Sequence, residues 1–296
     1  MHSTAVRRGD LLALSSALLF GVSGTVAADA FATFSPSQIA QFRSVVAALV
    51  LGWIAFRRRQ VSTGGHLGVL SLLGLFLASV TINFYWAIER LGVGPGVTIQ
   101  FLAPSIVLIW MRAVQRRPVP PAAWAAALTA LAGTSLITRA WEYQSLDPIG
   151  IAAGLGAAFS LAGYLISGEY LGRRLPGLTV GAYGFAISAL ILLVAAPIEL
   201  PSAGLVGWSQ LVWIAVGGTA LPFMMSMTAL RVTDPGRVGV LQSIEPAVGA
   251  GSAWIVLGQV LTGVQLLGGL VVVMSVAVIQ YLTSNVAPDV ASPHPI

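Results

Sequence analysis

One carboxylic acid inside a long apolar stretch is the residue of this sequence best placed to do chemistry. Glu245 lies near the middle of the stretch 235–257, three residues after Gln242 and directly before Pro246. The i, i+3 spacing puts Glu245 and Gln242 on one face of a helix, and Pro246 removes a backbone donor and loosens that helix. The carboxylate could bind an ammonium group or carry a proton. The alternative is a carboxyl group that only fixes helix packing.

The same glutamine–proline spacing occurs twice in the chain. Gln242 and Pro246 follow Gln100 and Pro104 at one offset of 142 residues, and Glu245 stands where the first copy has Ala103. We therefore expect an internal repeat. Pro104 and Pro246 are interpreted as hinges at two matched bends.

Further polar and aromatic side chains lie within apolar stretches and could line a binding cavity. Aromatic rings form the walls of many small-molecule sites, although each ring could equally serve packing. Buried amides could equally form hydrogen bonds between helices. The candidate binding residues are Phe20, Asn83, Trp86, Gln100, Phe101, Tyr164, Gln242 and Glu245.

Arg43 is a cation inside an apolar stretch, and two interpretations are open. It could meet a substrate carboxylate. It could instead pair with Asp29 or extend its head group to the membrane surface, which is the interpretation we favour.

The elements that must position these residues are membrane helices. Hydrophobic residues make up 56% of the 296-residue chain, charged residues only 8%, and the mean hydropathy is +0.87. A soluble domain carries about 25% charged residues, so the composition predicts an all-α integral membrane protein. Charge runs and Pro/Gly turns divide the chain into ten transmembrane helices. The expected spans are 10–31, 36–56, 66–88, 94–112, 120–139, 148–171, 177–197, 206–230, 235–257 and 262–284.

The repeat divides these spans into two five-helix halves, residues 1–142 and 143–285. Because each half holds an odd number of spans, the second half must be inverted relative to the first, an architecture typical of transporters. Residues 286–296, which include three prolines, are expected to form a disordered cytoplasmic tail.

Every basic residue is arginine, and their distribution predicts the orientation. If the N-terminus is cytoplasmic, twelve arginines lie inside and only Arg90 and Arg139 lie outside, which satisfies the positive-inside rule. Both termini are then cytoplasmic. The twelve are Arg7, Arg8, Arg57, Arg58, Arg59, Arg112, Arg116, Arg117, Arg173, Arg174, Arg231 and Arg237.

Other functional classes lack the residues that they need. Without cysteine, the chain can form neither a disulfide nor a thiolate metal site. The string Gly21-Val22-Ser23-Gly24 matches an intramembrane serine protease motif, but no histidine stands in the interior of any expected span to serve as the base. We therefore expect no enzyme activity, no cofactor, no metal and no nucleic-acid partner.

The segment Ala229–Gln259, with its Glu-Pro pair, resembles the signature of the drug/metabolite transporter superfamily in its ten-helix, EamA-type branch. It is similar to bacterial amino-acid exporters of the threonine/homoserine or aromatic type. The likeness implies a secondary transporter of the inner membrane that exports small metabolites, amino acids above all, by alternating access through a central cavity. Protons could be the ion to which export is coupled. A monomer could form the transporter, because ten helices are enough to enclose a central cavity.

The sequence departs from that family at the ends of two helices. The family often ends its fourth and ninth helices with Leu-Gly-Glu, where this chain has Trp110-Met111-Arg112 and Leu257-Gly258-Gln259. No role of that glutamate transfers here. A multidrug or nucleotide-sugar carrier, or a membrane scaffold or sensor, stays open as an alternative.

Overall fold

The computed structural model describes residues 2–91, 93–142, 147–195 and 203–284, and all regular elements within these residues are helical. Eight helical segments in this part of the chain are long and apolar enough to cross a membrane, and two shorter apolar helices complete the ten expected spans. The expected tail 286–296 lies outside the described residues.

The elements are α1 (His2–Ala30), α2 (Pro36–Arg57), α3 (Leu67–Leu91), α4 (Val93–Gln100), α5 (Ala103–Ala113), α6 (Pro121–Ile137), α7 (Pro148–Gly172), α8 (Gly177–Ala195), α9 (Leu205–Ala215), the π-helical turn η1 (Val216–Ala220), α10 (Leu221–Leu230), α11 (Pro235–Gln242), α12 (Glu245–Leu257) and α13 (Gly263–Ser284).

The fourth and ninth spans are each broken into two helices at the matched prolines. The breaks separate α4 from α5 and α11 from α12, at the same offset of 142 residues as the sequence repeat. Pro104 and Pro246 lack the N–H that would bond the carbonyl four residues earlier, which belongs to Gln100 and Gln242. The structure therefore interrupts both spans at the expected matched positions, and each interruption is a two-residue turn within one membrane span.

The eighth span differs from the continuous helix 206–230 that the sequence suggests. A π-helical turn, η1, separates α9 from α10, and the hydroxyl of Thr219 donates to the carbonyl of Ile214 at 2.7 Å. A Cβ on Gly218 would overlap the Ser23 side chain of α1. The glycine therefore allows close contact between α1 and this turn, a feature that helix periodicity does not reveal.

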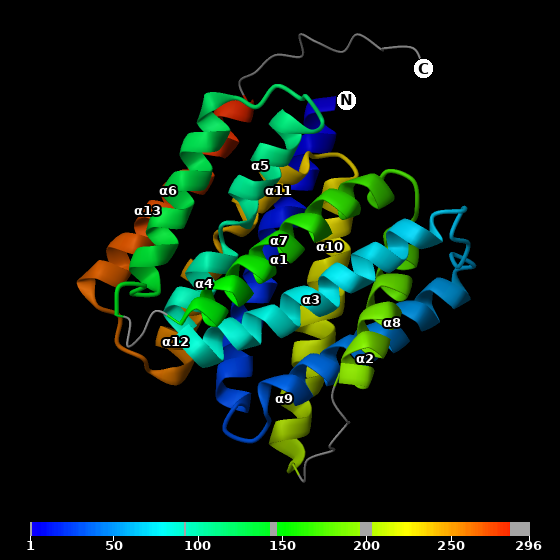
Figure 1. Ribbon diagram of the computed structural model, residues 1–296, viewed down its shortest axis with the longest axis horizontal. Coiled ribbons are helices and arrows are strands. Elements are labelled where there is room, and N and C mark those ends of the chain that lie inside the picture. The colour runs from blue at the N-terminus through cyan, green and yellow to red at the C-terminus, as the bar shows by residue number, and fades with distance from the viewer. Residues whose placement is uncertain (1, 92, 143–146, 196–202, 285–296) are drawn as a thin grey trace.

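The two halves pack through equivalent pairs of helices. We call helices at equivalent positions in the two halves repeat mates. The mates α2 and α8 lie against each other, and so do the mates α6 and α13 (Figure 1). In the same way, α3 packs on α7, and α1, the mate of α7, packs on α9, η1 and α10. This exchange symmetry is what an inverted repeat requires.

Three helices, α2, α7 and α11, begin with the same local sequence signal. A side-chain oxygen of Ser35, Asp147 or Asp234 caps the helix, and a proline follows directly. At the start of α7, the Arg90 guanidinium donates to Asp147 at 2.8 Å. This hydrogen bond, with help from the N–H of Ile149, holds the pKa of Asp147 below its usual range.

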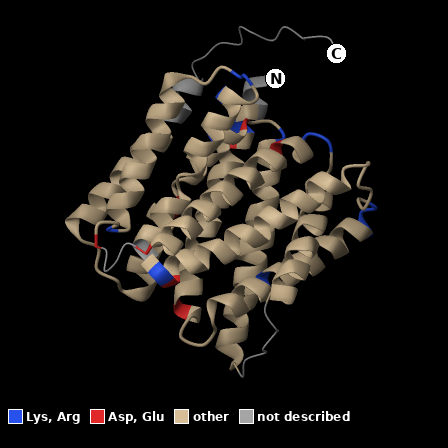
Figure 2. Ribbon diagram, in the orientation of Figure 1, with Lys and Arg blue, Asp and Glu red and all other residues tan. Residues whose placement is uncertain are grey.

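Most charged residues stand at the two ends of the bundle, with long uncharged stretches of helix between them (Figure 2). The beginning of α1 and the ends of α5 and α7 lie at one end, and the ends of α3 and α6 lie at the other (Figure 1). Seven of the twelve arginines expected to be cytoplasmic stand in or directly after the first group of ends: Arg7, Arg8, Arg112, Arg116, Arg117, Arg173 and Arg174.

Candidate functional site

A polar cluster joins four helices in the interior, and we name it by its members, the Ser16–Tyr164–Ser226–Gln242 cluster. The phenol of Tyr164 on α7 donates to the Ser226 hydroxyl on α10 at 2.9 Å. The side-chain amide of Gln242 donates to Ser16 on α1 at 2.8 Å and to Ser226 at 3.2 Å. Two predicted site residues, Tyr164 and Gln242, therefore share one partner.

Glu245 lies beside this cluster as the first residue of α12. A Cβ on Gly21 of α1 would lie 2.8 Å from the Glu245 carbonyl, so glycine there permits the close approach of α1 to the start of α12. The Glu245 side chain is half-buried and lies within electrostatic range of Tyr164 and Arg43. A carboxylate at a helix N-terminus is favoured by the helix dipole.

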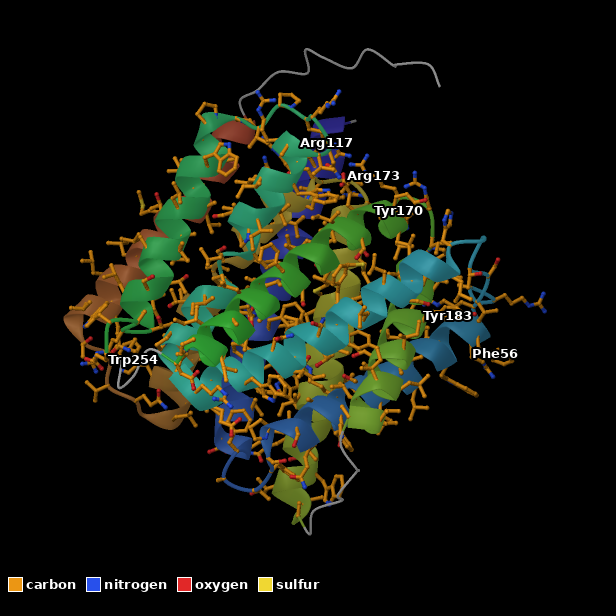
Figure 3. The ribbon with its side chains drawn as sticks, in the orientation of Figure 1. Phe56, Arg117, Tyr170, Arg173, Tyr183 and Trp254 are labelled. Carbon is orange, nitrogen blue, oxygen red and sulfur yellow. The ribbon has the colours of Figure 1, made fainter. Side chains whose placement is uncertain are left out.

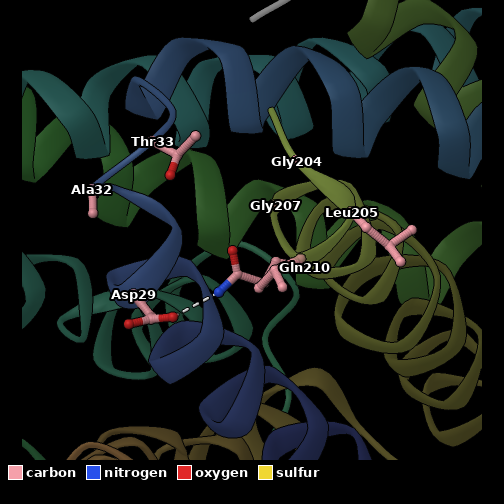
Figure 4. A pocket seen from close by; sticks show the side chains of 8 residues that line it. Asp29, Ala32, Thr33, Gly204, Leu205, Gly207 and Gln210 are labelled. Carbon is pink, nitrogen blue, oxygen red and sulfur yellow. Dashed lines mark hydrogen bonds between the residues drawn. The ribbon is translucent and has the colours of Figure 1, made fainter. Parts of the chain in front are cut away.

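Arg43 faces the interior and does not form the ion pair with Asp29 that we favoured. Asp29 instead accepts from the side-chain amide of Gln210 at 2.6 Å, beside a cavity of ≈ 390 Å³ between the end of α1 and the start of α9 (Figure 4). Arg43 lies within electrostatic range of Tyr85 and Glu245. The expectation failed because Asp29 lies at the end of α1, where Gln210 of α9 is within hydrogen-bonding distance of its carboxylate.

The repeat mates Gln100 and Gln242 differ in their surroundings. Each is the last residue before its helix break. Gln242 is bonded within the polar cluster, whereas the side-chain oxygen of Gln100 is buried and has no hydrogen-bond partner among the described residues. An unpaired buried acceptor is rare in proteins, and the role of Gln100 in binding stays a prediction.

The remaining candidates lie outside the hydrogen-bonded cluster. Asn83 donates to the backbone and hydroxyl of Ser79 in its own helix, α3. Phe101 is buried at the first helix break, Phe20 is half-buried, and Trp86 is 53% exposed. Their contribution to binding stays a prediction, and the exposed ring of Trp86 is the weakest candidate of the set.

Sequence reasoning missed two ion-pair groups at the arginine-rich end. Asp10 of α1 accepts from Arg237 of α11 at 2.7 and 2.5 Å, and both side chains are buried. Glu169 of α7 accepts from Arg117 and Arg173, which lie at one end of the bundle in Figure 3. The sequence did contain a signal for both groups, because Asp10 and Glu169 are acids that stand within expected membrane spans.

Asp234 stands next to these pairs, at the start of α11. It accepts from the backbone N–H of Arg237 at 2.9 Å. Burial raises the pKa of Asp234 above its usual range, and the nearby Glu169 adds to this effect. The arginine-rich end thus joins opposite charges from both halves, with Asp10, Arg237 and Glu169 buried and Arg117 and Arg173 partly exposed.

The serine-protease string is explained by packing. Gly21 allows the start of α12 to pack closely on α1, and Ser23 lies against Gly218. His66 lies between α2 and α3, where its ring packs edge-to-face with the Tyr170 ring, with 5.7 Å between the two ring centres. Ser23 therefore has neither a histidine base nor an open position in the described part of the chain.

The known proteins that are similar to this chain include two exporters and a solved structure with the same fold. The threonine/homoserine exporter RhtA of Salmonella typhimurium is 34% identical over 203 residues, 67% of this chain and 66% of that exporter, so the match spans slightly less than two thirds of the relative. The pseudopaline exporter CntI of Pseudomonas aeruginosa is 23% identical over 275 residues, 91% of this chain and 95% of CntI. A crystal structure with 17% sequence identity shares the fold, with a TM-score of 0.80 over 93% of this chain and 96% of its own.

The family model described as the EamA-like transporter family matches the chain twice, over residues 7–139 and 148–281. These two matches cover nearly all of the described helices, and they agree with the paired packing of the two halves. The chain belongs to the EamA-like transporter family, a family of multi-pass membrane transporters.

Proposed function

We propose that this protein is a secondary transporter that exports small metabolites, with amino acids as its main substrates, by alternating access through a central cavity. The observation that carries the proposal is the placement of opposite charges, Glu245 and Arg43, within electrostatic range of each other beside a polar cluster. The named activities of RhtA and CntI, both exporters, support the direction of transport. The helical bundle favours the bacterial inner membrane, because outer-membrane proteins are β-barrels.

A zwitterion fits this pair of charges. Its ammonium group would bind the Glu245 carboxylate, and its carboxylate would bind the Arg43 guanidinium, which forms two parallel hydrogen bonds with such a group. Each charge is expensive within a membrane unless it is matched. A bound amino acid would separate Glu245 from Arg43 while keeping both matched.

The broken helices add partial charges to the same region. The N-terminal ends of α5 and α12 carry partial positive charge, and the C-terminal ends of α4 and α11 carry partial negative charge. Discontinuous helices in other transporters bind anionic groups at their N-termini and cations at unwound carbonyls. The carbonyls of Gln100 and Gln242, which proline deprives of their usual helical donor, are suited to an ammonium group or a proton carrier.

The decisive experiment is counterflow of labelled amino acids in proteoliposomes, with and without a pH gradient. We expect saturable exchange of threonine, homoserine or an aromatic amino acid. A dependence on the gradient would assign proton coupling. If nucleotide sugars or cationic drugs exchange while every amino acid fails, the amino-acid assignment is wrong and the transporter assignment stands.

The two repeat-matched glutamines give a test against a purely structural membrane scaffold. Gln242→Leu removes the bonds to Ser16 and Ser226, worth about 1 kcal/mol each, and we expect about tenfold slower counterflow or more. Gln100→Leu removes only an unpaired oxygen and should raise KM at normal expression. Unchanged transport in both variants, measured at matched protein levels, would contradict a role for this region.

The two prolines give a test of the hinges. Pro104→Ala with Pro246→Ala restores one backbone hydrogen bond in each broken helix, worth about 1 kcal/mol each. We expect normal folding and about thirtyfold slower exchange, because the bends would no longer open freely. Pro222→Ala, a helix-start proline on α10 outside the breaks, is the matched control. Equal rates for the double variant and the wild type would reject the hinge role.

A further inference from the structure

A lipid-facing groove between α2 and α8 lies beside the densest run of positive charge in the chain. The groove has a volume of ≈ 220 Å³ and is lined by small or flat side chains, namely Ala48, Gly52, Ala55, Ala182, Tyr183 and Ala186. Large apolar side chains on both sides of it are exposed: Leu49 and Trp53 on α2 and Leu190 on α8. The groove therefore opens toward the hydrocarbon core of the membrane.

Three consecutive arginines end α2 at the mouth of this groove. Arg57, Arg58 and Arg59 are exposed and have no ion-pair partner within the described residues. The guanidinium of Arg57 lies over the Trp53 ring, 5.6 Å from its centre. A tryptophan and an arginine stacked at the end of a membrane helix are typical of the interface, where lipid head groups lie.

The backbone that carries these arginines is held firmly against α8. The Thr179 hydroxyl donates to the carbonyl of Gln60 at 2.7 Å, and the Tyr183 phenol donates to the carbonyl of Val61 at 3.0 Å. Arg59 adopts a left-handed conformation with φ of 55°, which non-glycine residues rarely adopt. The surrounding contacts hold this strained turn in place, so the arginines form a fixed site rather than a loose loop.

We propose that this groove is a binding site for an anionic phospholipid, with an acyl chain between α2 and α8 and the phosphate at Arg57, Arg58 and Arg59. Basic pockets between membrane helices bind anionic head groups, and each arginine near the surface strengthens binding by about fivefold. The groove supplies the space for the acyl chain, and Figure 3 shows Tyr183, which lines the groove, near Phe56 of α2 at the same end of the bundle. A zwitterionic lipid would fill the groove equally well but would leave the three arginines unmatched.

The test is native mass spectrometry of the purified full chain, mixed with phosphatidylglycerol or phosphatidylcholine. We expect wild-type protein to retain phosphatidylglycerol at least tenfold better than phosphatidylcholine. Gly52→Phe should lower phosphatidylglycerol retention by about tenfold, because Gly52 lines the groove, a Cβ there meets no atom within 4 Å, and the ring would occupy the groove. All charges are kept in that variant.

Two further variants keep the test interpretable. Gly269→Phe on α13 also enters open space, outside the groove, and should retain phosphatidylglycerol like the wild type. Replacing Arg57, Arg58 and Arg59 by glutamine should remove the preference for the anionic lipid. Equal retention of both lipids by the wild type, or equal loss in Gly52→Phe and Gly269→Phe, would overturn the proposal.

Discussion

Glu245→Gln is expected to abolish most amino-acid export while leaving membrane expression unchanged. The substitution keeps the shape of the side chain and removes its charge. A hydrogen bond to a charged group contributes about 1.5–3 kcal/mol, so we expect export to fall by about 10- to 150-fold. Counterflow at matched protein levels measures the loss.

The same variant also reports on coupling. If the Glu245 carboxylate carries a proton, Glu245→Gln should lose the response of export to a pH gradient as well as the rate. If the carboxylate only binds substrate, KM should rise and the response should persist. Glu142→Gln is the matched control, since Glu142 is exposed and pairs with Arg139 at the surface. Wild-type export with a wild-type pH response in Glu245→Gln would refute its role.

The helical plan of this protein could be predicted from sequence because membrane solvation imposes simple rules. An uncharged apolar segment must form a helix in lipid to satisfy its backbone. The expected starts at Pro36, Pro148, Gly177 and Pro235 therefore coincide with the observed helix starts. The breaks after Gln100 and Gln242 could be anticipated for a similar reason, because proline removes a specific hydrogen bond.

The interior contacts were harder to anticipate. Ser16 and Ser226 complete the polar cluster, but a serine in a membrane helix commonly bonds its own backbone, as Ser243 does with Gly239. The π-helical turn that contains Gly218 packs closely against Ser23 of another helix. Such features arise from tertiary packing, and local sequence carries no signal for them.

The partners of the charged side chains were the least predictable feature of the site. Pairing with Asp29 was one of the interpretations of Arg43, while the structure places Arg43 within electrostatic range of Glu245 and gives Asp29 to Gln210. Arg237 counted only as an inside charge, yet it is buried against Asp10. Arginine counts report which side of the membrane a loop occupies, and they contain no information about which helix lies opposite.

Asp10→Asn is expected to destabilise the protein strongly, because it leaves the buried Arg237 guanidinium unmatched. Removing one partner of a buried ion pair costs about 3–5 kcal/mol. In a chain of this size, that corresponds to a fall in Tm of about 10 °C, measurable by thermal unfolding in detergent. Asp147→Asn is the control, since its pair with Arg90 is exposed and exposed pairs contribute little.

The double variant Asp10→Leu with Arg237→Met distinguishes a missing partner from a damaged helix contact. It removes both charges and keeps similar volumes where α1 meets α11. Apolar replacement of a buried pair is often neutral or stabilising, so Tm should return to within a few degrees of the wild type. If the double variant is as unstable as Asp10→Asn, the loss comes from packing at this contact, and the unmatched-charge explanation fails.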